Sequence, residues 1–125
     1  MRILFVGLGS IGQRHLRIIK SLYKRKIDIY YLKNLKNNLV ISDNLKAKKV
    51  KSLSKHYNIK EINFSQITSG FIDLTFITNP PFLHMNYALK LAKLKSNLFI
   101  EKPLSHNLRG INSLINISKK KKIKI

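Results

Sequence analysis

The sequence contains no cysteine, and its 5 acidic residues stand against 25 lysines and arginines. The lack of cysteine excludes disulfide bonds, thiolate catalysis and zinc sites built on sulfur, and it fits a reducing compartment, so we expect a cytoplasmic protein. No apolar run approaches the roughly 20 residues that a membrane-spanning helix needs. Gly7 and Gly9 interrupt the apolar stretch at the N-terminus, which is not the pattern of a signal peptide. We therefore expect no membrane partner.

The shortage of acidic residues leaves a formal net charge of +20 at pH 7. Taken alone, this charge favours a nucleic acid or an anionic membrane as partner. However, 20 Lys, 18 Ile and 12 Asn make up two fifths of the 125 residues. All three amino acids have A/T-rich codons, so coding bias can raise the lysine count. The basic residues are also spread over helix surfaces and loops and are not interleaved with aromatic residues, so we expect no specific nucleic-acid partner.

A chain of 125 residues has the size of a single domain and can bury a core. Apolar and β-branched runs predict strands over residues 2–6, 27–32, 59–64, 71–78 and 97–101. Helical spacing predicts helices over residues 10–24, 45–57 and 81–95, a loop over 34–44, and a last helix with Ser105 as its N-cap. This alternation indicates an α/β domain with a doubly wound parallel sheet, a Rossmann-like fold that ends before or within its sixth strand.

The turn after the first predicted strand reads GLGSIG, a G-x-G-x-x-G pattern that begins at Gly7 and runs directly into a helical pattern. This strand–turn–helix context is the one in which the pattern binds a dinucleotide. Gly7 would permit the tight turn, Gly9 would let a pyrophosphate approach the backbone, and Gly12 would let the helix lie close to the sheet. Backbone amides near Ser10 and Ile11 would face the phosphate charge. The alternative is a glycine-rich turn kept only for close packing.

The end of the second predicted strand bears on the choice between NADP and NAD. In a dinucleotide fold an acidic residue at this place accepts a hydrogen bond from the ribose 2′-hydroxyl of NAD. Here Leu32, Lys33 and Asn34 occupy the place, and the next acid is Asp43. Lys33 and Lys36 would instead meet a 2′-phosphate, which favours NADP over NAD. The alternative is that both are solvated loop lysines in a lysine-rich chain.

Three segments together resemble one known family. They read VGLGSIGQRHLR over Val6–Arg17, ITNPPFLHMNYAL over Ile77–Leu89, and FIEKPLS over Phe99–Ser105. In this order they are similar to the N-terminal NAD(P)-binding domain of the Gfo/Idh/MocA oxidoreductases, which carry a Thr, Pro and His after the fourth strand and a Glu-Lys-Pro signature. The resemblance covers nearly the whole chain, and the combination is far more specific than any one of the motifs.

The resemblance implies a set of site residues. Lys102 would be the catalytic residue beside the nicotinamide and the substrate, where its ammonium can hydrogen-bond the reacting oxygen. Glu101 would lie at the cofactor, and Pro103 would shape the turn; the peptide bond before a proline is one that can be cis. The residues at the pyrophosphate would be Gly7, Gly9, Ser10, Ile11 and Gly12. Those bordering the adenine-ribose and nicotinamide side would be Thr78, Asn79, Pro80 and His84.

Two histidines have structural alternatives. His84 would equally suit an ordinary position in the first turn of a helix. His15 lies on the inward stripe of the first predicted helix, so we expect a packed, hydrogen-bonded side chain and not a ligand.

The resemblance also implies an activity. A hydride would pass between NAD(P) and a carbon of a sugar, a cyclitol or a similar polyol. Members of the family continue into a second domain that supplies most of the substrate pocket, so residues 1–125 would be a partial enzyme that holds only the Rossmann domain. Whether the chain is an enzyme by itself stays open, and an uncovered strand edge would favour self-association. The alternatives are a non-catalytic nucleotide-binding or interaction module and, with less support, a basic nucleic-acid binder.

Overall fold

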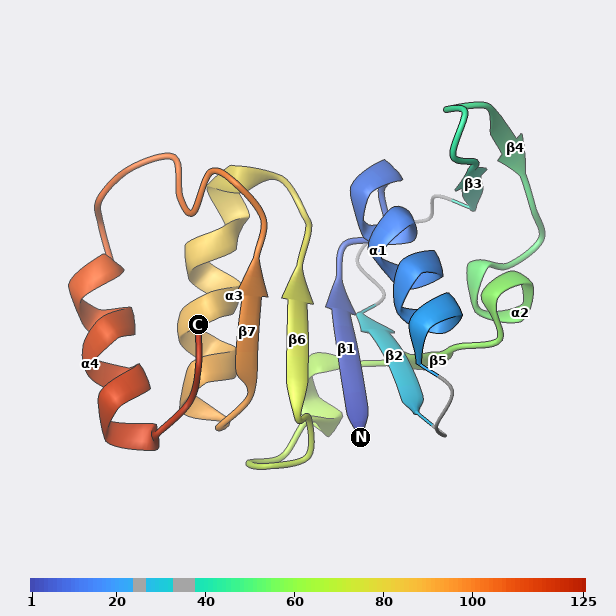
Figure 1. The fold of residues 1–125 in the computed structure, drawn as a ribbon. Helices are drawn as coiled ribbons and strands as arrows, with labels where there is room; N and C mark the ends of the chain where they lie inside the picture. Colours follow the sequence, from blue (N-terminus) through green and yellow to red (C-terminus); the bar gives the residue numbers. More distant parts are fainter. Residues whose placement is uncertain (24–26, 33–37) are drawn as a thin grey trace.

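The computed structural model describes residues 1–23, 27–32 and 38–125 (Figure 1). Its centre is a parallel sheet of five strands in the order β5-β2-β1-β6-β7. These strands are β1 (Arg2–Val6), β2 (Asp28–Leu32), β5 (Lys60–Ile62), β6 (Leu74–Ile77) and β7 (Asn97–Ile100). The helices are α1 (Ser10–Leu22), α2 (Leu53–Tyr57), α3 (Pro81–Lys93), α4 (Ile111–Lys121) and one turn of 3-10 helix, η1 (Phe64–Gln66). The predicted doubly wound α/β fold is confirmed.

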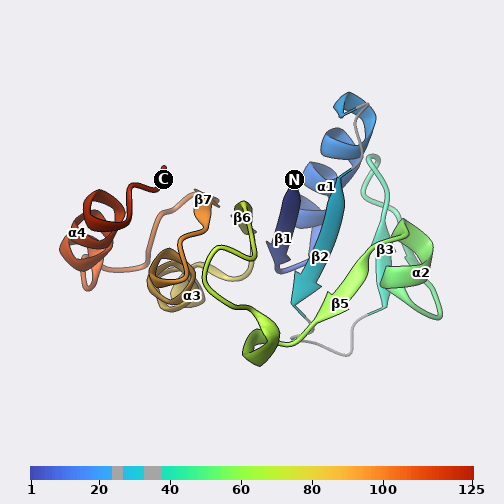
Figure 2. The same cartoon turned by 90° about the horizontal axis from the view of Figure 1, so that it is seen from below.

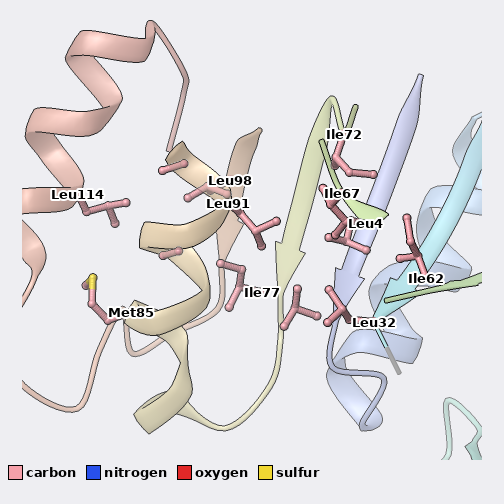
Figure 3. Packing of buried hydrophobic residues seen from close by; sticks show 13 residues of the cluster. Leu4, Leu32, Ile62, Ile67, Ile72, Ile77, Met85, Leu91, Leu98 and Leu114 are labelled. Carbon is pink, nitrogen blue, oxygen red and sulfur yellow. The ribbon is translucent and has the colours of Figure 1, made fainter. Parts of the chain in front are cut away.

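Helices cover both faces of the sheet, as Figure 2 shows in a view from below. In β1, Ile3 and Phe5 belong to the core cluster that includes α1 and α2, whereas Leu4 and Val6 belong to the cluster that includes α3 and α4. The second cluster joins β1, β6 and α3 and reaches α4 through Leu114 (Figure 3). Because β1 is covered on both sides, its sequence is an unbroken apolar run from Ile3 onward.

The predicted helix over residues 45–57 is wrong in its first part. The chain forms an antiparallel hairpin of β3 (Leu39–Ile41) and β4 (Ala47–Lys49), so part of the predicted loop over 34–44 is also a strand. Leu45 has a φ of 62°, a left-handed conformation that a helix cannot contain. The helix starts only after Ser52, whose Oγ accepts a hydrogen bond from the backbone N–H of Lys55 at 3.4 Å.

The predicted N-cap Ser105 is also wrong, because α4 begins six residues later. Its N-cap is Gly110, with a φ of +89°. A Cβ at Gly110 would lie 2.8 Å from Cγ of Met85 on α3. The bare glycine therefore lets the chain turn against α3 before α4 starts, and no local pattern near Ser105 indicates that contact.

No sixth strand of the parallel sheet forms in the described residues after α4, but residues 123–125 run beside β7. The backbone N–H of Leu98 donates to the carbonyl oxygen of Lys124 at 2.9 Å, and the N–H of Lys124 donates to Oδ1 of Asn97 at 2.8 Å. Within the described part of the chain, no helix has the length and apolar character needed to cross a membrane.

Candidate functional site

The register of three neighbouring strands brings the three sequence motifs to one edge of the sheet. Val6 of β1 pairs with Ile77 of β6, and Ile77 pairs with Ile100 of β7. The residues that follow are Gly7, Thr78 and Glu101, so they form a row at the carboxyl edge. From this edge α1 leaves toward one face of the sheet and α3 toward the other (Figures 1 and 2). This is the topological switch point at which doubly wound sheets bind ligands.

The three glycines of the turn differ in what surrounds them. Gly7 has a φ of +101°, and a Cβ there would lie 2.6 Å from the backbone nitrogen of Asn79. A Cβ at Gly12 would lie 2.7 Å from Oγ1 of Thr78 and would also collide with the carbonyl oxygen of Gly7. A Cβ at Gly9 would meet no atom within 4 Å. Gly7 and Gly12 therefore serve the close approach of α1 to β6, and the backbone at Gly9 faces open space.

The glycine turn is tied to the end of β6 by Thr78. Its buried hydroxyl donates to the carbonyl oxygen of Gly7 at 2.6 Å, and its backbone N–H donates to the carbonyl oxygen of Val6 at 2.9 Å. Ser10 and Ile11 are the first residues of α1, directly after this turn. Their backbone amides belong to the first turn of the helix, whose N–H groups have no partner within the helix.

His84 joins the start of α3 to the loop after β7. Its ring is 1% exposed, with Nε2 2.6 Å from the carbonyl oxygen of Asn79 and Nδ1 3.0 Å from that of Pro103. A neutral imidazole has a single N–H, so it donates to one carbonyl at a time. His84 therefore packs between two segments that flank the row. Pro80 lies exposed at the N-cap of α3.

Among the described residues of this region, Asn79 is the one whose buried side-chain polar atoms have no hydrogen-bond partner. Its Oδ1 and Nδ2 are both buried, and neither has a hydrogen-bond partner among the described residues. Most buried side-chain amides in proteins are hydrogen-bonded, so such a group calls for an explanation. A ligand that binds at the switch point would supply the missing partner.

Glu101 and His15 form a pair across the sheet. Nε2 of His15 lies 2.7 Å from Oε1 of Glu101, and the backbone N–H of Lys102 donates to Oε2 at 3.1 Å. The hydrogen bond from His15, more than any other contact, lowers the pKa of Glu101 below its ordinary value. This carboxylate therefore stabilises the fold above the ordinary pKa of a glutamate, and the contribution is lost as the pH falls through the lowered pKa. The expectation of a hydrogen-bonded His15 is confirmed.

Lys102 differs from Glu101 and His84 in that its described side chain makes no hydrogen bond or ion pair. Its side chain is exposed and has no hydrogen-bond or ion-pair partner within residues 1–23, 27–32 and 38–125. The peptide bond between Lys102 and Pro103 is cis. Lys33, the residue expected to read the 2′-phosphate, lies outside the described residues, as does Lys36.

Sequence reasoning missed Gln13, which is fully buried on α1. Its Nε2 donates to the carbonyl oxygens of Leu8 at 2.8 Å and Leu39 at 2.7 Å. Its Oε1 accepts from the backbone N–H of Ile41 and from the hydroxyl of Tyr57, each at 2.8 Å. A single amide thus joins the glycine turn to the β3–β4 hairpin and α2. A glutamine directly after the glycine pattern is the only signal that the sequence offers for this role.

A small hollow of about 130 Å³ lies between the start of α1 and the turn of the hairpin. It is lined by Ser10, Ile11, Arg14, Arg17, Ser42, Asp43 and Leu45. Arg17 closes part of this hollow, because its guanidinium pairs with Asp43 at 2.5 Å and donates to the carbonyl oxygen of Ile41 at 2.8 Å. The hairpin therefore places the first acidic residue after β2 beside the helix that follows the glycine turn.

The strand order, the glycine turn and the switch point define a dinucleotide-binding Rossmann domain. Over residues 1–125 the sequence matches the family described as oxidoreductase family, NAD-binding Rossmann fold (GFO_IDH_MocA). The chain belongs to the Gfo/Idh/MocA oxidoreductases and corresponds to their N-terminal, NAD-binding domain. This confirms the resemblance seen in the three sequence segments. Among curated proteins, none matches the sequence.

Solved structures share the fold at low sequence identity. A probable dehydrogenase from Thermotoga maritima is 21% identical, with a TM-score of 0.71 over 98% of this chain and 34% of its own. The WlbA dehydrogenase from Chromobacterium violaceum, in complex with NADH and UDP-GlcNAcA, is 15% identical (TM-score 0.73; 98% and 33%). Biliverdin reductase from Synechocystis sp. PCC 6803, in complex with biliverdin and NADP+, is 17% identical (TM-score 0.74; 98% and 36%). The chain spans about a third of the length of these proteins.

Proposed function

We propose that this chain holds NADP or NAD at the glycine turn and forms the cofactor-binding part of an oxidoreductase that acts on a sugar, a cyclitol or a similar polyol. The observation that carries the proposal is the row of Gly7, Thr78 and Glu101 at the carboxyl edge of β1, β6 and β7. This row places the glycine turn, the Thr-Asn-Pro segment and the Glu-Lys-Pro segment around one point.

The residues at this point fit a dinucleotide. The open space at Gly9 leaves the backbone accessible to a pyrophosphate. The amides at the start of α1, near Ser10 and Ile11, provide donors for its oxygens at the positive end of the helix dipole. The unpartnered amide of Asn79 offers a donor and an acceptor to the ribose or the nicotinamide. Thr78 acts indirectly, because its hydroxyl is committed to the carbonyl oxygen of Gly7.

Lys102 is the residue that we assign to the reacting end. A bound nicotinamide cofactor supplies hydride transfer, and the protein supplies orientation and electrostatics. The free ammonium of Lys102 would hydrogen-bond the substrate oxygen whose carbon gives or takes the hydride. Glu101 would hold the backbone of Lys102 beside the cofactor, and His84 would hold the Asn79 and Pro103 segments on either side.

The substrate class rests on the family and on one of the similar structures. The WlbA dehydrogenase was solved with NADH and a nucleotide sugar, UDP-GlcNAcA, whereas biliverdin reductase was solved with a substrate of another kind. A sugar or related polyol matches the resemblance and the first of these structures, and it is the class that we propose here.

The direct test uses the purified chain of 125 residues. We expect saturable binding in a fluorescence titration with NADPH, and no turnover across a panel of sugars and cyclitols. Hydride transfer needs a substrate held at near-attack distance and a group that moves the hydroxyl proton, and loss of either costs orders of magnitude in rate. Of the described titratable groups at or beside the row, Glu101 is bonded to His15 and both ring nitrogens of His84 are engaged, which leaves Lys102 for this task.

Each other result has a definite meaning. If the chain binds neither NADPH nor NADH, the proposed cofactor site is contradicted. Turnover by the isolated chain contradicts the proposal that these residues are only the cofactor-binding part. Binding to DNA that weakens with salt and is unaffected by NADPH supports the nucleic-acid alternative instead.

A further inference from the structure

The hydrogen bond between His15 and Glu101 connects two parts of the chain that are 86 residues apart. His15 lies on α1, the helix that follows the glycine turn, and Glu101 directly follows β7. The side chains of His15 and Glu101 are 22% and 18% exposed, so the pair is partly accessible to water. The pair spans from α1 to the segment that carries Lys102.

Both partners are held in place by their surroundings. The ring of His15 packs edge-on against Phe99 at a centroid distance of 5.1 Å and lies 5.8 Å from the ring of Phe76. The backbone N–H of Glu101 donates to the carbonyl oxygen of Ile77 at 3.0 Å. The second carboxylate oxygen of Glu101 accepts from the backbone N–H of Lys102 at 3.1 Å. One carboxylate thus joins the imidazole of His15 to the backbone of Lys102.

We propose that His15 is a positioning residue that holds Lys102 through Glu101, and that protonation of His15 tightens this hold. The inference rests on the proposed function, in which Lys102 faces the reacting groups. A neutral His15 with its proton on Nε2 already donates to Glu101. The bond to the ionised carboxylate is already charge-assisted, and an imidazolium adds the attraction between opposite charges. Histidine is the side chain that ordinarily changes charge between pH 5 and 8.

The charged surroundings of the pair are simple in the described part of the chain. α1 contributes His15 itself, and the loop after β7 contributes Lys102, whose charge also lowers the pKa of Glu101. β6 and β7 contribute Phe76 and Phe99, which carry no charge. We therefore assign the pH dependence of the link to His15.

His84 is the rival source of a pH-dependent signal near Lys102, because its Nδ1 lies 3.0 Å from the carbonyl oxygen of Pro103. It reaches the segment from α3, on the opposite side from His15. The two sources are separable by mutation, since His15→Gln removes the titrating ring on α1 and leaves His84 intact. A glutamine also keeps an N–H donor for Glu101.

The test follows the backbone amide of Lys102 by NMR in the full chain labelled with ¹⁵N, between pH 5 and 8. In wild type we expect this amide signal to move in a single step that coincides with the titration of the His15 ring. The step should disappear in His15→Gln and in Glu101→Gln, each of which is close in size to the residue it replaces. It should persist in His106→Gln, which removes an exposed histidine from the same loop.

A fluorescence titration with NADH over the same pH range gives the functional readout, because NADH lacks the 2′-phosphate of NADPH, which itself titrates at about pH 6. We expect the affinity of wild type to rise as His15 becomes protonated, and the profile of His15→Gln to be flat. If no dinucleotide binds at any pH, the proposed function fails, whereas the amide titration still decides whether His15 and Lys102 are linked. A Lys102 step that survives unchanged in His15→Gln identifies His84 as its source and overturns the inference. Glu101→Gln provides the same test if His15→Gln does not fold.

Discussion

The Cβ position of Gly12 lies 2.7 Å from Oγ1 of Thr78, the same hydroxyl that donates to the carbonyl oxygen of Gly7. A side chain at Gly12 would therefore separate α1 from the end of β6 and disturb the hydrogen bond that shapes the turn. Gly9, three residues earlier, has no neighbour within 4 Å of its Cβ position. The two glycines of one motif thus have different physical reasons to be glycine.

This difference predicts that a substitution at Gly12 lowers stability, whereas a substitution at Gly9 abolishes cofactor binding. Gly12→Ala should destabilise the fold by about 1–3 kcal/mol, the usual range for overpacking at a filled position. Gly9→Val should change the free energy of unfolding by less than about 1 kcal/mol, and it should abolish binding of NADPH because its side chain occupies the space for the pyrophosphate. Urea unfolding measures the first effect, and a fluorescence titration measures the second. Equal NADPH affinity for Gly9→Val and wild type would contradict the assignment of the glycine turn.

A second prediction concerns the amide of Gln13. Gln13→Leu keeps the size of the side chain but leaves the buried hydroxyl of Tyr57 and the partly buried N–H of Ile41 without their acceptor. Each unsatisfied buried group costs about 1–3 kcal/mol, so we expect a loss of at least about 2 kcal/mol in urea unfolding. Faster hydrogen exchange at the N–H of Ile41 should accompany it.

The control for this change is Gln66→Leu, the same substitution at an exposed position on η1, where the side chain accepts one hydrogen bond from the N–H of Asn63. It should cost clearly less than Gln13→Leu and leave exchange at Ile41 unchanged. Similar losses of stability for the two variants would show that Gln13 does not hold the hairpin.

Gln13 and the hairpin also show where sequence patterns stop being informative. The first strand, the glycine turn and α3 were predictable because each is encoded by contiguous apolar, glycine or proline residues. The helix predicted over residues 45–57 rested on a four-residue spacing from Leu45 to Tyr57. That spacing misled because Leu45 is 76% exposed in a left-handed turn, whereas Tyr57 is buried and bonded to Gln13. The hairpin is held against α1, and such a contact leaves no periodic signal.

The candidate site was predictable to the extent that its motifs are local. The glycine pattern, the Thr-Asn-Pro segment and the Glu-Lys-Pro segment are each recognisable in the sequence, and the parallel sheet brings them to one edge. The partner of Glu101 was not predictable, because it depends on the register of β7 relative to β6 and on the rotation of α1. His15 could be assigned to the inward stripe of its helix, but no pattern connects that stripe to a residue 86 positions away.

The last prediction concerns cofactor choice, which the family leaves open between NAD and NADP. Because no acidic residue occurs between Tyr31 and Asp43, and because Asp43 is paired with Arg17, we expect NADPH to bind more tightly than NADH. Lys33→Asp should narrow or reverse this preference, since a carboxylate repels a 2′-phosphate and accepts a hydrogen bond from a 2′-hydroxyl. Parallel fluorescence titrations with the two reduced cofactors measure the ratio directly.

The matched control is Lys120→Asp, which makes the same change of charge at an exposed residue of α4, on the far side of α3 from the glycine turn (Figure 1). General electrostatic attraction of the basic chain for the more highly charged NADPH would be reduced equally by both variants. If Lys33 binds the 2′-phosphate specifically, only Lys33→Asp would reduce the preference for NADPH over NADH. If wild type prefers NADH, or if the two variants shift the ratio equally, Lys33 does not select the cofactor, and the excess of lysine in this sequence is a general property of its surface.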